Sequence, residues 1–244
     1  MILEIVSDNF EKHLFVLCCV VLRRLGDIQD FRRIMTKRDS NHIRLIIFDL
    51  GNVVFEVQNQ NAFRYWAGLT SFTEDYFAEH HVPDWVFHQF ERGELTPVEF
   101  YNALIRYKKV DLSFEDFSIG WNSIFGDVYP EIHSALKELA DSVGLAALTN
   151  TNELHRQVWS KKYAETLKHF NRIFISSLLG FRKPEERAFI HVLKECNMTP
   201  HEILFFDDVF ENIEKANALG MHVVQVSHPT DVTTELTKRG LIAV

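Results

Sequence analysis

Five short apolar segments, separated by segments with helical spacing, constrain the fold of this chain more than any other feature. They are RLIIF (44–48), GLAALTN (144–150), RIFIS (172–176), EILFF (202–206) and HVVQV (222–226). Near-continuous apolar strands are typical of a parallel sheet that is buried on both faces. The segments between them carry apolar residues at three- and four-residue spacing, which indicates helices. The pattern predicts an α/β fold, a Rossmann-like parallel sheet with helices on both faces and right-handed crossovers.

The connection between the first two strands is anomalous, because it holds roughly ninety residues where a few are usual. Residues 58–128 within it are rich in aromatic side chains, with turn signals at Gly93 and Pro97. We predict that they form a small helical cap domain, and that residues 43–57 and 129–244 form the core domain. Residues 1–42 are an N-terminal extension without an assigned structure. Because Met35 lies just before the first strand, we expect translation to begin there, which the intact mass of the native protein tests.

Composition narrows the class of protein. The formal net charge is −8 and the pI is about 5.8, so a nucleic-acid partner is disfavoured, because neutralising phosphates requires a basic surface. The three cysteines, Cys18, Cys19 and Cys196, form no disulfide framework by number or spacing. The longest apolar run, residues 14–22, is far shorter than the about 20 residues that span a bilayer. We therefore expect a cytoplasmic protein without a membrane partner; the sequence does not predict its oligomeric state.

Polar side chains stand where the apolar segments end. Asp49 follows the first, Thr149 lies at the end of the second, and Asp207 and Asp208 follow the fourth. Lys183 comes after the third, in LLGFRKPE. Because ligands of open α/β sheets bind at the carboxyl ends of the strands, we expect these side chains to lie together.

Electrostatics indicate what such a cluster binds. Two carboxylates about 4 Å apart repel each other by roughly 4 kcal/mol at an effective dielectric of 20. Lys183 offsets part of this repulsion and a divalent cation offsets more, and oxygen ligands favour Mg²⁺, which also accepts phosphate oxygens. Asp49 can then attack phosphorus to form an aspartyl-phosphate, while Thr149 and Lys183 hold the non-bridging oxygens. Taken singly, each residue has an ordinary alternative as a helix cap, a turn residue or a solvated lysine; their conjunction favours phosphoryl chemistry.

The segments IIFDLGNV, LTN, FRKP and FFDDVFENI resemble, in order, four motifs of the haloacid dehalogenase superfamily. With FHQFERGEL and LTNTNELH they are similar to the bacterial α-D-glucose-1-phosphate phosphatase branch. The resemblance implies a phosphatase acting on a small phosphorylated metabolite, a sugar phosphate such as glucose 1-phosphate, with Asp49 as nucleophile. The site residues that it implies are, for Mg²⁺, Asp49, the Gly51 carbonyl, Asp207 and, in an outer position, Asp208; for the phosphoryl group, Thr149, Asn150 and Lys183; and, in support of the metal loop, Asn212.

Gly51 departs from the wider superfamily, in which this position carries an aspartate that protonates the leaving oxygen. The glucose-1-phosphatase branch shares the glycine. General acid–base assistance is typically worth about 10²- to 10⁴-fold in rate. We therefore expect another group or a water molecule to transfer the proton, and a substrate with a good leaving group.

Cap residues His88, Glu91 and Arg92, in FHQFERGEL, are candidates for contacts with substrate hydroxyls, although each alone also fits a solvated helix end. Two other functions remain open. A haloacid dehalogenase shares the fold and nucleophile but has no use for the Asp207–Asp208 pair, because it works without metal. A catalytically weak binding protein on the same fold is the second.

Overall fold

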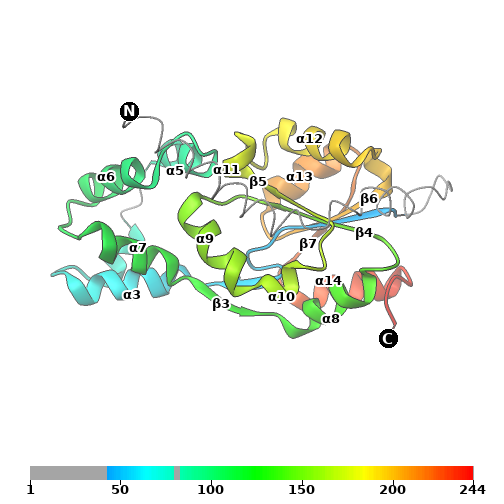
Figure 1. Ribbon diagram of the computed structural model, residues 1–244, viewed down its shortest axis with the longest axis horizontal. Coiled ribbons are helices and arrows are strands. Elements are labelled where there is room, and N and C mark those ends of the chain that lie inside the picture. Colours follow the sequence, from blue (N-terminus) through cyan, green and yellow to red (C-terminus); the bar gives the residue numbers. More distant parts are fainter. Residues whose placement is uncertain (1–42, 80–82, 244) are drawn as a thin grey trace, which may run out of the picture. The chain divides into compact units, whose positions relative to one another are not determined.

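The computed structural model describes residues 43–79 and 83–243 (Figure 1). The predicted extension 1–42 and the expected start at Met35 lie outside these residues. A five-stranded sheet has the order β5-β4-β1-β6-β7, and all of its neighbouring strands are parallel. Its strands are β1 (Leu45–Phe48), β4 (Gly144–Thr149), β5 (Arg172–Ile175), β6 (Ile203–Asp207) and β7 (His222–Gln225). The α/β fold and all five predicted strands are confirmed.

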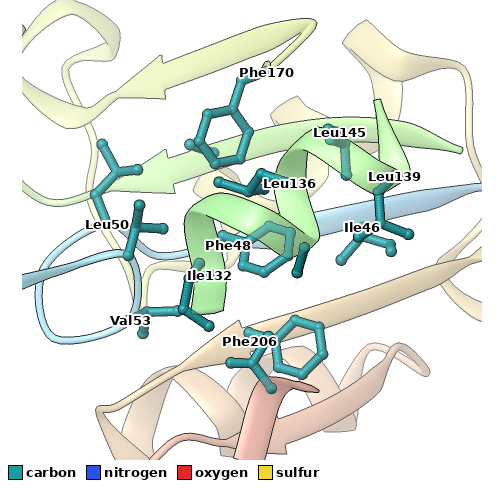
Figure 2. Close-up of a cluster of buried hydrophobic side chains, with 14 of the residues drawn as sticks. Ile46, Phe48, Leu50, Val53, Ile132, Leu136, Leu139, Leu145, Phe170 and Phe206 are labelled. Atoms are coloured by element: carbon teal, nitrogen blue, oxygen red, sulfur yellow. The ribbon is translucent and has the colours of Figure 1, made fainter. Parts of the chain in front are cut away.

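Strand β1 is central because both of its faces are covered. All four of its residues are fully buried. Ile46 and Phe48 belong to the hydrophobic cluster on one face, where Ile132 and Leu136 of helix α8 pack against the sheet (Figure 2). Side chains alternate along a strand, so Leu45 and Ile47 are buried against the opposite face. A strand in this position has no polar face, which explains its continuous apolar sequence.

The core helices alternate with the strands. Helices α12 and α13 lie on one side of the sheet in Figure 1, and α8 and α14 lie on the other. Their bounds are α8 (Pro130–Leu139), α9 (Glu153–Lys162), α10 (Ala164–Leu167), α11 (Ser176–Leu179), α12 (Glu186–Cys196), α13 (Phe210–Ala218) and α14 (Pro229–Lys238), with a 3₁₀ turn η2 (Pro200–Glu202). Gly220, with φ of 91°, follows the end of α13, in a conformation that glycine adopts without strain.

The described residues of the inserted segment form five helices with a hydrophobic core of their own. They are α3 (Asn59–Leu69), α4 (Glu74–Glu79), α5 (Asp84–Glu91), α6 (Pro97–Lys108) and α7 (Phe114–Asn122). Aromatic side chains dominate this core: Trp66, Phe77, Phe90, Phe100 and Phe117 are all at most 1% exposed. Each domain buries its own apolar surface. The proposal that residues 58–128 form a cap domain rests on this separate core.

Two short strands that the sequence analysis did not predict lie at the ends of this insertion. Strands β2 (Phe55–Val57) and β3 (Phe125–Val128) pair in antiparallel fashion. Both are too short to show an alternating pattern, and they are far apart in the chain. Only tertiary pairing reveals them.

No helix among the described residues is long and apolar enough to cross a membrane.

Two glycines test the packing of the cap. A Cβ on Gly120 in α7 would lie 2.2 Å from Nε1 of the buried Trp66, so we expect Gly120→Ala to lower the free energy of unfolding by about 1–3 kcal/mol. Gly68 in α3 has nothing within 4 Å of an added Cβ, and Gly68→Ala is expected to raise it by about 0.5–1 kcal/mol. Urea unfolding of both variants measures the difference, and equal effects would contradict this description of the cap core.

Candidate active site

The register of the sheet brings the predicted acids together. Phe48 at the end of β1 is paired with Phe206 in β6, so the next residues, Asp49 and Asp207, lie at the same level. The Asp49 N–H also donates a hydrogen bond to the Phe206 carbonyl, at 2.8 Å. Carboxylate oxygens of Asp49, Asp207 and Asp208 all lie within 4.8 Å of one another. The carboxyl edge of two adjacent strands therefore forms a three-carboxylate cluster.

The Lys183 ammonium lies between two of these carboxylates. Its Nζ donates a 2.6 Å hydrogen bond to Oδ2 of Asp207 and lies 2.9 Å from Oδ1 of Asp49. The side chains of Lys183 and Asp207 are 1% and 0% exposed, and that of Asp49 is 14% exposed. Burial alone would lower the pKa of Lys183, but Asp207 and Asp49 outweigh it and the net shift is upward. The lysine is a permanent cation in the site.

The site has capacity for a further cation. Oδ1 of Asp49 is buried and contacts the Lys183 ammonium, which it shares with Asp207. Burial raises the pKa of Asp49 to about 7, Lys183 opposes this shift, and Asp207 and Asp208 add to it. One ammonium thus does not compensate three carboxylates. An all-oxygen donor set in which two buried carboxylates share one ammonium fits Mg²⁺.

Backbone and amide donors orient the other two carboxylates. Oδ1 of Asp207 accepts from the Val209 N–H and from Nδ2 of Asn212, both at 2.9 Å. Asn212 is 3% exposed, and its contact agrees with the predicted supporting role. Oδ2 of Asp208 accepts from Nδ2 of Asn52, at 3.2 Å. Asn52 has a φ of 56°, a conformation that asparagine tolerates better than most residues, and the sequence analysis did not assign it to the site.

The predicted phosphoryl ligands lie on neighbouring loops. Thr149 ends β4, which pairs directly with β1, and is 5% exposed. The Asn150 side chain is turned toward the Lys183 backbone: its Nδ2 donates to the Lys183 carbonyl and its Oδ1 accepts from the Lys183 N–H, both at 2.9 Å. Both polar atoms of Asn150 are therefore engaged by the protein. Its role as a phosphoryl ligand and that of the Gly51 carbonyl as a metal ligand stay predictions.

Two of the three cap candidates, Glu91 and Arg92, contact the core. The Glu91 carboxylate, 8% exposed, accepts from Nε of Arg182 at 2.7 Å. Burial raises the pKa of Glu91, although Arg182 counteracts it. Arg92 forms ion pairs with Glu94 at 2.6 Å and, across to the core, with Glu185 at 3.1 Å.

His88 belongs to the same polar region. Burial, and next the charge of Arg182, lower the pKa of His88. Arg182 was missed by the sequence analysis, although its place next to Lys183 in FRKP was the available signal.

His155 joins cap and core in a way that its sequence context did not show. Its ring is stacked on Trp121 at 4.9 Å between ring centroids, its Nε2 lies 2.9 Å from the Trp121 carbonyl, and its Nδ1 lies 3.1 Å from Nδ2 of Asn152. Burial lowers the pKa of His155 to about 4. His155 is therefore a neutral packing residue.

The sequence profile of the haloacid dehalogenase-like hydrolases matches residues 43–220. The chain belongs to this family. The predicted superfamily is therefore confirmed.

Individual relatives refine this assignment. The chain is 26% identical over 201 residues to a D-ribitol-5-phosphate phosphatase of Bacteroides thetaiotaomicron, which covers 80% of this chain and 97% of the relative. A sesquiterpene phosphatase of Aspergillus oryzae is 33% identical over 139 residues, 54% of this chain and 68% of the relative. Together with the family match, these relatives confirm the prediction of a phosphatase; they do not support the finer prediction of a glucose-1-phosphate phosphatase.

A solved structure shows the same fold. A haloacid dehalogenase-family enzyme of Bacteroides thetaiotaomicron superposes with a TM-score of 0.66 at 25% identity, over 75% of this chain and 93% of that one. A further crystal structure of that enzyme contains magnesium and inorganic phosphate.

Magnesium is expected to stabilise the folded protein, because only the folded chain assembles the three carboxylates. At a concentration of 100 times the dissociation constant the gain is about 2.7 kcal/mol. We expect the thermal unfolding midpoint to rise with Mg²⁺, to return with EDTA, and to rise much less in Asp208→Asn. Asp141→Asn, at an exposed position in the loop after α8, is the control and should respond like the wild type. An equal rise in Asp208→Asn would exclude Asp208 from the metal site.

Proposed function

We propose that the protein is a Mg²⁺-dependent phosphatase that hydrolyses a small phosphorylated sugar or sugar alcohol through an aspartyl-phosphate on Asp49. The observation that carries the proposal is the position of Asp49: it is partly exposed at the tip of the central strand, and one of its oxygens lies beside an ammonium. A carboxylate that served only to balance Lys183 would not need two further carboxylates next to it. Asp49, Asp207 and Asp208 are the residues that would hold the metal ion.

The proposed reaction has two steps. An oxygen of Asp49 attacks phosphorus, the bond from phosphorus to the substrate oxygen breaks, and that oxygen takes a proton from a water molecule or another group, because Gly51 has no side chain to supply one. Water then attacks the phosphorus of the aspartyl-phosphate, which releases inorganic phosphate and restores the carboxylate. Lys183 holds charge that develops on the phosphoryl oxygens, and Thr149 is placed to donate to them. When bound, Mg²⁺ supplies positive charge that reduces the repulsion between the carboxylate and the phosphate.

The proposed substrate class rests on two supports. The D-ribitol-5-phosphate phosphatase matches almost along its full length. The cap residues nearest the site are also charge-compensated, since Glu91 pairs with Arg182 and Arg92 pairs with two glutamates, one of which also pairs with Arg187. Such a region offers hydrogen bonds without a net charge, which suits hydroxyl groups better than a second anionic group. D-ribitol 5-phosphate is the first candidate, and glucose 1-phosphate, the expectation from the sequence, is the comparison.

Asp49→Asn tests the nucleophile, because an amide is isosteric with the carboxylate but does not form the acyl-phosphate. We expect hydrolysis of p-nitrophenyl phosphate to fall to background in Asp49→Asn, and in the wild type with EDTA. Acid quenching during turnover should give wild-type protein heavier by one phosphoryl group, and no such species in the variant. Mg²⁺-independent release of chloride from 2-chloropropionate, without phosphate release from any sugar phosphate, would instead identify a dehalogenase.

Gly51→Asp tests the missing acid. A Cβ at this position would lie 3.2 Å from Cγ2 of Val57, a contact that a small shift relieves. If proton transfer to the leaving group limits the wild type, the new carboxyl should accelerate alkyl phosphates by up to about 10²-fold, and p-nitrophenyl phosphate much less, because that leaving group needs no proton. Turnover is measured against the pKa of the leaving alcohol. An unchanged dependence would show that the proton is already supplied by another group.

A further inference from the structure

The last turn of cap helix α5 is joined to the core at closely spaced points. Helices α5 and α11 lie side by side (Figure 1). The Glu91 carboxylate binds Arg182, and the Glu91 carbonyl accepts a 2.6 Å hydrogen bond from Oγ of Ser176. Gly93 has a φ of 70°, and a Cβ there would lie 2.3 Å from the Ser177 carbonyl oxygen. The backbones of cap and core therefore approach as closely as a residue without a side chain allows.

Ser176 connects this contact to the loop after β4, which carries the predicted phosphoryl ligand Asn150. Its hydroxyl accepts a 2.9 Å hydrogen bond from the Thr151 N–H while it donates to Glu91. Ser176 is 1% exposed and Thr151 is 5% exposed. Thr151 follows Thr149 by two residues, so a displacement of Glu91 acts on the backbone beside the predicted phosphoryl ligand.

Asn150 connects the same loop to Lys183. Its carboxamide forms two hydrogen bonds with the Lys183 backbone, and Arg182, the neighbour of Lys183, returns to the Glu91 carboxylate. The contacts close into a ring. In order, its members are Glu91, Arg182, Lys183, Asn150, Thr151 and Ser176. The ring contains one cap residue, and that residue contributes both a carboxylate and a backbone carbonyl.

We propose that Glu91 is a positioning residue for the phosphatase reaction. Glu91 lies in the cap, and its contacts fix the position of the backbone that carries Lys183. The inference rests on the proposed function, since it concerns the same site. It replaces the sequence-based expectation that Glu91 contacts substrate hydroxyls. The Glu91 and Arg182 side chains, 8% and 16% exposed, form an ion pair with each other. Lys183 in turn has its ammonium between Asp207 and Asp49, so a shift of its backbone changes the position of the charge at the nucleophile.

The variant Glu91→Gln tests this role, and Glu185→Gln is its matched control. Glu185 also forms a cap-to-core ion pair, with Arg92 at 3.1 Å, but it lies outside the ring. With p-nitrophenyl phosphate and saturating Mg²⁺, we expect Glu91→Gln to lower kcat by roughly 10²-fold, the size that a misplacement of about 1 Å produces, with little change in KM. Glu185→Gln should retain the wild-type kcat. The double variant Glu91→Gln/Arg182→Gln should lose no more than the larger single effect, because both changes break one contact.

Amide hydrogen exchange gives a readout that does not depend on activity. We expect exchange to accelerate in Glu91→Gln at the Thr151 and Lys183 amides, which donate within the ring, and not in Glu185→Gln. If the wild type hydrolyses no phosphate ester, the proposed function fails, but the exchange measurement still tests whether Glu91 positions the Lys183 backbone. If Glu91→Gln does not fold, the double variant, in which two neutral amides replace the ion pair, carries both measurements.

Three results would overturn the proposal. One is a rise in KM for D-ribitol 5-phosphate with unchanged kcat on p-nitrophenyl phosphate, which would make Glu91 a substrate contact. The second is an equal loss of kcat in Glu91→Gln and Glu185→Gln, which would indicate general attachment of the cap. The third is unchanged exchange at the Thr151 and Lys183 amides in Glu91→Gln.

Discussion

A buried ammonium between two carboxylates organises the site of this protein. Lys183 and Asp207 are almost fully buried, and Asp49 is mostly so. Charges at such depth are tolerated only where their partners are fixed, because removing them from water costs several kcal/mol per ion. The surrounding structure supplies that fixation. Asn150 holds the Lys183 backbone, and Asn212 holds the Asp207 carboxylate.

The sheet makes this arrangement possible. Its central strand is buried on both faces, so it is held rigidly, and its carboxyl end is the place where Asp49 leaves the apolar interior. The carboxyl ends of β4 and β6 supply Thr149 and the two aspartates, and the loop after α11 supplies Lys183, so the site draws on separate parts of the chain. The negative charge of the cluster exceeds the one ammonium that Asp49 and Asp207 share, and this excess is the physical reason that we expect a cation. The inserted segment keeps an aromatic core of its own and contacts the core domain both through the ion pair of Glu91 with Arg182 and through the stack of Trp121 on His155.

Sequence patterns predicted the sheet and the cluster because both depend on local features. A buried strand needs continuous apolar residues, and parallel strands deliver their terminal side chains to one edge, so the strand ends predicted which residues meet. The patterns missed strands β2 and β3, whose few residues carry no periodic signal and whose pairing is distant in the chain. They also did not indicate the contacts that Asn150 makes with the Lys183 backbone and Glu91 with Arg182. Residue type indicates what a side chain is able to bind, whereas its partner depends on which loop lies opposite.

The sequence by itself determined the fold class, the family, and the acids, lysine and threonine that stand at the strand ends, because these follow from composition and order along each segment. Tertiary structure decided how they act on one another. It placed Lys183 against Asp49 and Asp207, turned the Asn150 side chain to the Lys183 backbone, and joined Glu91 of the cap to Arg182 of the core. The residues that these contacts join are between 24 and 134 positions apart in the sequence. Only the folded chain sets such distances, because they depend on packing and not on sequence spacing.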